Sequence, residues 1–106
     1  MTRETFPDFS PNESVAMVNI KIFLPGCSSL KEKRHRLSPL LHRMQKEFNV
    51  SSAETGLQDY LQSAWISCVS VSNSQKFNKE KFEALKLFIE ENFPELEIEE
   101  FNFEIR

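Results

Sequence analysis

The stretch Pro25–Arg36, PGCSSLKEKRHR, joins two segments with different hydrophobic patterns, and it decides the fold of this chain. On its N-terminal side, apolar residues alternate along Val15–Leu24, which predicts a strand with one buried face. Pro25-Gly26 then breaks the strand and turns the chain. On its C-terminal side, apolar residues recur at helical spacing as far as Phe48, which predicts a helix.

The helix is expected to begin at Ser29, because Ser29 and Glu32 have the S-x-x-E spacing of a capping box. Pro39 lies inside the helical pattern and removes one backbone hydrogen bond. The alternative is a second helix capped by Ser38, with Pro39 at its first position. The apolar stripe keeps its phase across Pro39, so we predict a single kinked helix.

The remaining sequence predicts three more strands and a second helix. The strands are expected at 50–54, 62–72 and 96–105, and the helix runs from a cap at Asn78 to about Asn92, before Pro94. A one-residue bulge near Glu99-Glu100 would bring both apolar sets of the last strand to one face. The order β-α-β-β-α-β predicts an α+β, ferredoxin-like domain, with a four-stranded antiparallel sheet and two helices on one face.

The chain of 106 residues is expected to hold one domain, residues 15–106, after a disordered or loosely docked tail at 1–14. A run of apolar residues long enough for a membrane span is missing, and so is a secretory signal. Cys27 and Cys68 are therefore expected to be small buried residues rather than a disulfide. These features favour a cytoplasmic protein that does not enter membranes.

Positive charge gathers on the first predicted helix, although the net charge of the chain is −3. Several cations in its first turns oppose the helix dipole, an unfavourable placement that hints at function. Such an array suits the phosphates of RNA or of the ribosome, whereas the plainer alternative is a solvated helix face. The predicted nucleic-acid-binding residues are Lys31, Lys33, Arg34, Arg36, Arg43 and Lys46.

A second candidate group consists of polar residues at the ends of the short second strand. Asn49, Ser51, Glu54 and Asp59 are candidates for a small polar pocket, and the two carboxylates are candidates for acid–base chemistry. Turn and cap formation explains the same residue types. The sequence has no Gly-rich phosphate loop and no aromatic RNA-binding octapeptide. It therefore predicts no cofactor and identifies no small-molecule substrate.

Two further features bear on partners and metals. His35 and His42 lie seven residues apart, which is not the usual spacing of a helical zinc pair, so no metal site is predicted. The sheet face opposite the helices would carry Asn19, Lys21 and Phe23, and an apolar patch there would need a partner. This face makes a homodimer or protein-interaction module the alternative function.

The chain resembles the YlxP-like family of small bacterial proteins of unknown function over about residues 16–105. The most specific similarity is the pattern P-G-x-x-S-L-K-x-K-R, here Pro25–Arg34, followed by Phe48–Ser51 and Glu54. Asp59 and Ser72-Asn73 also match, but Leu61 occupies a position where the family usually has Trp. The resemblance implies a ferredoxin-like fold and no established activity.

We therefore predict a non-catalytic cytoplasmic protein that binds RNA or a ribonucleoprotein through its basic first helix. A homodimer module built on the open sheet face is the alternative. A small enzyme that uses Glu54 and Asp59 ranks third.

Overall fold

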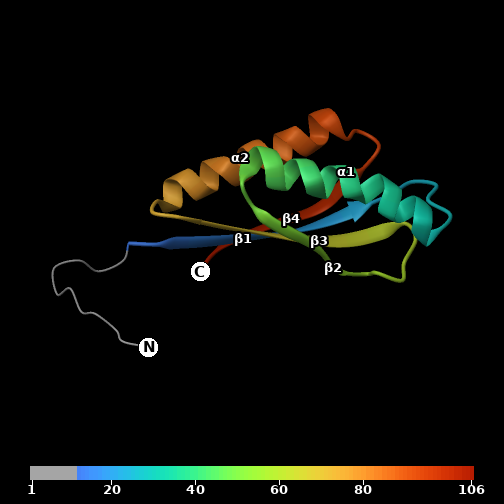
Figure 1. Ribbon diagram of the computed structural model, residues 1–106, viewed down its shortest axis with the longest axis horizontal. Helices are drawn as coiled ribbons and strands as arrows, with labels where there is room; N and C mark the ends of the chain where they lie inside the picture. The colour runs from blue at the N-terminus through green and yellow to red at the C-terminus, as the bar shows by residue number, and fades with distance from the viewer. Residues whose placement is uncertain (1–11) are drawn as a thin grey trace.

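The structure is a computed structural model that describes residues 12–106. Its elements are β1 (Ser14–Phe23), α1 (Leu30–Phe48), β2 (Ser51–Gly56), β3 (Ser63–Ser72), α2 (Gln75–Asn92) and β4 (Glu97–Ile105). The strands form one antiparallel sheet in the order β2-β3-β1-β4, and both helices cover the same face of it (Figure 1). The α+β, ferredoxin-like prediction is confirmed. Most of the predicted tail, residues 1–11, lies outside the described residues, and Ser14 already pairs with Ser72 in the sheet.

The hydrophobic core lies between the sheet and the two helices. Alternate residues of β1 are buried, as the period of two predicted, while the residues between them are half-buried on the opposite face. Helix α1 contributes Leu37, Leu40 and Met44 to the core, and α2 contributes Phe82, Leu85 and Ile89. Cys27 and Cys68 are both free and buried, and burial raises the pKa of the Cys68 thiol to about 12.

Helix α1 is one continuous helix with Pro39 inside it, so the prediction of a single helix across Pro39 is confirmed. Ser29 is the N-cap, and the N–H of Glu32 donates to its Oγ at 3.0 Å. The returning bond differs from the expected capping box, because the Glu32 carboxylate accepts from the N–H of Ser28 at 2.6 Å. This bond lowers the pKa of Glu32. The helix ends at Asn49, which has a left-handed φ of 51°.

The predicted bulge in the last strand is present. Lys21 pairs with Glu100, but the next residue of β1, Ile22, pairs with Ile98. Glu99 is therefore the extra residue, and its insertion changes the parity of β4. As a result Ile98, Phe101 and Phe103 all pack against the core.

The predicted cap of the second helix is wrong. Ser74 caps α2, because its Oγ accepts from the N–H of Phe77 at 3.1 Å, and the helix begins at Gln75. Asn78 instead lies in the first turn with its side chain fully buried. Its Oδ1 accepts from Ser70 Oγ at 3.1 Å, and its Nδ2 donates to the carbonyl of Ser14 at 3.1 Å. Asn78 therefore ties α2 to β1 and β3.

Candidate functional site at the start of the first helix

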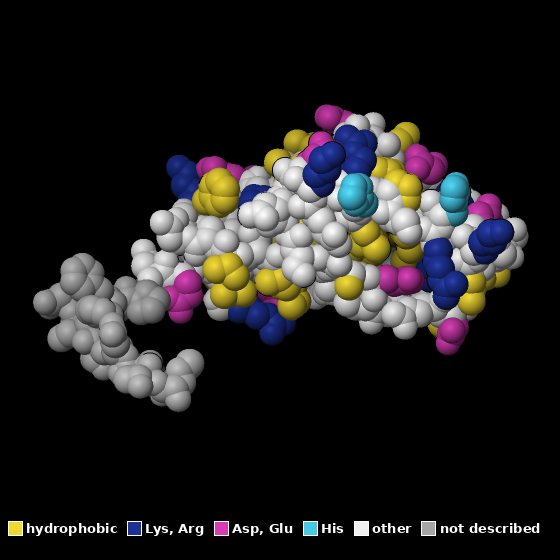
Figure 2. All heavy atoms as spheres, in the orientation of Figure 1, with side chains coloured by type: hydrophobic (Ala, Val, Ile, Leu, Met, Phe, Trp, Pro, Cys, Tyr) yellow, Lys and Arg dark blue, Asp and Glu magenta, His cyan; other side chains and the backbone are white. Residues whose placement is uncertain are grey.

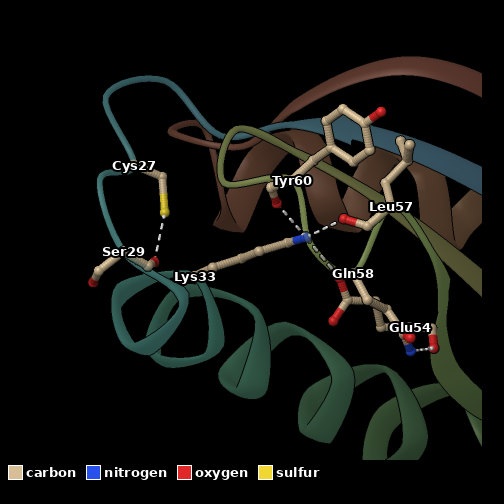
Figure 3. Close-up of polar contacts among 7 residues, drawn as sticks. All are labelled: Cys27, Ser29, Lys33, Glu54, Leu57, Gln58 and Tyr60. Carbon is tan, nitrogen blue, oxygen red and sulfur yellow. Dashed lines mark hydrogen bonds and ion pairs between the residues drawn. The ribbon is translucent and has the colours of Figure 1, made fainter.

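Lys33 is the most unusual residue of the site, because its side chain is only 2% exposed. Its ammonium donates to the carbonyl of Leu57 at 2.8 Å and to the carbonyl of Tyr60 at 2.7 Å (Figure 3). Its third neighbour is Glu54, whose Oε2 lies 2.8 Å from Nζ. A lysine is rarely buried unless its charge is paired and its donors are satisfied; here the charge is paired with Glu54, and two of the three N–H donors bind carbonyl oxygens. Lys33 thus fastens the β2–β3 loop to α1.

Glu54 and Leu57 complete this arrangement from the side of the sheet. Glu54 pairs with Ile66, a core residue, so it shares the face of the sheet that the helices cover. Its Oε2 is buried and forms an ion pair with Lys33, but it makes no aligned hydrogen bond within residues 12–106. Leu57 has a left-handed φ of 59°, which is unfavourable for a leucine. The loop keeps this conformation while its carbonyl accepts from Lys33.

A polar cavity of about 340 Å³ opens beside this ion pair. Glu54 and Asp59 both line it, so the structure brings together the two carboxylates that the sequence singled out. The full set of lining residues is Leu30, Lys33, Arg34, Glu54, Gln58 and Asp59.

The other two residues of the predicted polar pocket lie elsewhere. Asn49 is the C-terminal cap of α1. Ser51 pairs with Val69 in the sheet, three residues along the strand from Glu54, so its side chain points to the opposite face. The structure therefore does not form the pocket of Asn49, Ser51, Glu54 and Asp59 as one site.

Three of the six predicted phosphate-binding cations are engaged within the fold. Lys33 is buried in the ion pair described above. Arg36 donates to the carbonyl of Pro25 at 2.8 Å and to the carbonyl of Glu95 at 3.2 Å. Arg43 pairs with Glu47 at 2.7 Å, and its guanidinium lies 4.7 Å from the centre of the Phe88 ring. These side chains hold α1 to its surroundings.

Lys31, Arg34 and Lys46 are exposed on α1, as predicted. Two exposed histidines, His35 and His42, join them, and Figure 2 shows both histidines on the helix side of the molecule, with basic side chains near them. We call these five residues the α1 cationic stripe. An open hollow of about 780 Å³ follows part of it, lined by Ser29, Lys31, Glu32, Arg34, His35, Ser38, Pro39 and His42.

Across 12–106, no three His, Cys, Asp or Glu side chains are grouped so that they could hold a metal ion. Within the same range, neither helix is both long enough and apolar enough to cross a membrane.

Sequence reasoning missed the burial of Lys33, although a signal for it was present. Lys33 falls within the apolar stripe of α1, three residues after Leu30 and four before Leu37. A cation at such a position needs a buried acceptor, and Glu54 occupies a strand position that faces the helices. The pattern of the helix therefore indicated a buried cation at Lys33, whereas the charge count indicated a surface residue, and only the fold identified Glu54 as its partner.

Comparison with known proteins places the chain in a family. Residues 15–103 match the family model described as "Protein of unknown function (DUF503)". The chain is also 41% identical over 83 residues to the "Uncharacterized protein YlxP" of Bacillus subtilis (strain 168), an alignment that covers 78% of this chain and 89% of that protein. These two matches show that the chain belongs to the DUF503 family of proteins of unknown function.

Proposed function

We propose that this protein binds RNA, free or within a ribonucleoprotein, through the α1 cationic stripe. The observation that carries the proposal is the division of the helix cations into two groups. Lys33, Arg36 and Arg43 contact groups of the same chain, whereas Lys31, Arg34 and Lys46 are exposed together with His35 and His42. Of the acidic residues of α1, only Glu32 lines the hollow, and the N–H of Ser28 already occupies its carboxylate.

The spacing of the stripe suits a phosphate backbone. From Lys31 to Lys46 the helix rises by about 22 Å, at about 1.5 Å per residue. A single nucleic-acid strand carries one phosphate per ~3.4 Å of helix axis, so several phosphates fit along this length. Lysine, arginine and histidine side chains contact phosphates without reading bases, so we expect binding with little sequence preference.

The test measures the affinity for a labelled single-stranded RNA by fluorescence anisotropy at low salt. The variant Lys31→Glu/Arg34→Glu should lose at least tenfold in affinity. The slope of log affinity against log salt should also fall by about 1.4, because two phosphate contacts are lost. The matched control, Lys76→Glu/Lys79→Glu, makes the same change of net charge at exposed positions of α2.

Equal losses in the two variants would contradict the proposal, because they would show that net charge matters and that α1 does not. Absence of binding by the unmodified protein at low salt would also contradict it. Circular dichroism of each variant checks that the fold is retained.

An enzyme that uses Glu54 and Asp59 ranks below RNA binding. Both carboxylates line the same cavity, which is the observation in favour of catalysis. Glu54, however, is held by Lys33 in an ion pair that fastens the neighbouring loop. This arrangement accounts for Glu54 structurally, so the two carboxylates support the enzyme alternative less than the exposed stripe supports RNA binding.

A further inference from the structure

The helices leave one face of the sheet uncovered (Figure 1). The side chains of its strands on that face are half apolar. On the central strands it carries Met17, Phe23, Trp65 and Val69, each half-buried, and Val71, which is 66% exposed. In the middle of this face the side chains are polar and joined to one another. Ser67 Oγ donates to Asn19 Oδ1 at 2.6 Å, and Ser67 and Thr55 share a hydrogen bond of 2.7 Å.

The register of β1 against β3 gives this face an internal symmetry. Met17 pairs with Val69, Asn19 pairs with Ser67, and Val15 pairs with Val71. Each of these pairs joins two residues of the same kind, apolar with apolar or polar with polar. Two copies whose open faces meet could be related by a twofold axis that is parallel to the strands and midway between β1 and β3. In such a dimer, β1 of one copy would lie over β3 of the other, so side chains of the same kind would meet in these pairs. An isologous interface requires such self-complementarity.

Two pairs of this face differ in kind, Phe23 with Ser63 and Lys21 with Trp65. Next to Trp65 the face contains a hollow of about 310 Å³, lined by Asn19, Thr55, Gly56, Trp65 and Asn102. The same twofold axis brings Lys21 of a second copy over this hollow. Its ammonium would meet the indole ring and the oxygens of Thr55 and Asn102, a suitable set of contacts for a cation.

The charges of β4 fit this arrangement and disfavour nucleic acid on the same face. Glu100 and Glu104 are exposed there, next to Lys21 and Met17. The twofold axis places β4 of one copy over β2 of the other, where Ser51, Ala53 and Thr55 carry no charge. The acidic residues of the two copies therefore do not meet, whereas a phosphate backbone would meet them directly.

We propose that the open sheet face is a homodimer interface in which Lys21 of each copy enters the hollow beside Trp65 of the other. The four strands have 10, 6, 10 and 9 residues. At about 3.3 Å per residue and about 4.8 Å between strands, they present about 550 Å² per copy. Two such faces total about 1,100 Å², near the lower limit for specific interfaces, so we expect a weak dimer that forms at high protein concentration. The two α1 helices lie on the outer sides of this dimer, so the proposal is independent of RNA binding.

Sedimentation velocity over a range of protein concentrations tests the proposal, with tryptophan emission as a second readout. Trp65 is the only tryptophan of the chain, so its emission reports on this face alone. The unmodified protein should pass from monomer to dimer with rising concentration, and its emission should shift to shorter wavelength in parallel. Lys21→Glu should weaken the dimer at least tenfold and abolish the shift. Lys79→Glu makes the same charge change on exposed α2 and should leave the dimer unchanged.

Val71→Lys is the second interface variant, because its exposed site lets the monomer fold normally. It should also weaken the dimer at least tenfold. The proposal is overturned by an unmodified protein that remains monomeric up to about 1 mM, since even a weak specific dimer forms at that concentration. It is equally overturned by a dimer that survives both Lys21→Glu and Val71→Lys, because such a dimer must use another surface.

Discussion

Replacing the buried Lys33 with methionine should destabilise the fold strongly, while leaving the length of the side chain nearly unchanged. The substitution removes the ammonium that contacts Glu54 and the carbonyls of Leu57 and Tyr60. Loss of one partner of a buried ion pair costs about 3–5 kcal/mol, because the other charge is left unpaired. The Glu54 side chain is 22% exposed and Tyr60 lies in an exposed loop, so water partly replaces the lost contacts. We therefore expect a loss at the lower end, about 3 kcal/mol.

Urea unfolding followed by circular dichroism measures this loss for Lys33→Met and for the matched control Lys31→Met. Lys31 lies two residues away on the exposed side of α1, so its replacement should change the free energy of unfolding by less than about 0.5 kcal/mol. In thermal unfolding, about 3 kcal/mol corresponds to a fall of roughly 12–24 °C in Tm for a domain of this size.

A double-mutant cycle with Glu54→Gln separates the ion pair from general effects of the substitution. Since Lys33 and Glu54 are in contact, the double variant should lose at least about 1 kcal/mol less than the sum of the two single variants. The reasoning fails if Lys33→Met resembles Lys31→Met in stability. It fails also if the two single losses add, because additive losses would mean that the pair contributes no interaction energy.

Three further predictions concern the core and strand β2. Asn78→Ala should lower the free energy of unfolding in urea by about 2 kcal/mol, because it leaves the buried Ser14 carbonyl without its donor. The control Asn92→Ala, at the exposed end of α2, should lower it by less than about 1 kcal/mol. Burial holds the pKa of Cys68 at about 12, above the ordinary value of 9.0, so the unfolded state loses this proton first as the pH rises. The contribution of this thiol to the free energy of unfolding is therefore fully present below about pH 9 and falls toward pH 12, by at most ~1.4 kcal/mol per pH unit. In Cys68→Ala, the free energy of unfolding should depend less on pH in this range. Gly56→Ala should destabilise β2 by about 1 kcal/mol, because the added methyl group would lie 3.2 Å from Trp65 Cδ1; a stability equal to that of the unmodified protein would show that Trp65 moves freely.

Local patterns in the sequence determined the architecture of this protein. The period of two in β1, the cap at Ser29 and the leucine stripe of α1 are short-range features, and each produced the predicted element. The bulge at Glu99 was also readable, because the apolar residues of β4 change parity there. Such features depend on backbone geometry within a few residues, so they can be read without knowing what packs against them.

Tertiary structure alone decided which polar side chains are available to a partner. Lys33 meets the carbonyls of Leu57 and Tyr60 at separations of 24 and 27 residues, and Arg36 meets the Glu95 carbonyl 59 residues away. Asn78, which looked like a cap, bonds to Ser14 across 64 residues.

A charge count treats all six cations of the first helix alike, because it contains no information on such distant acceptors. The fold decides which of these cations are buried and which stay exposed, because a cation is buried only where an acceptor lies beside it. The fold therefore followed from local periodicity, whereas the candidate binding surface followed from contacts between residues far apart in the chain.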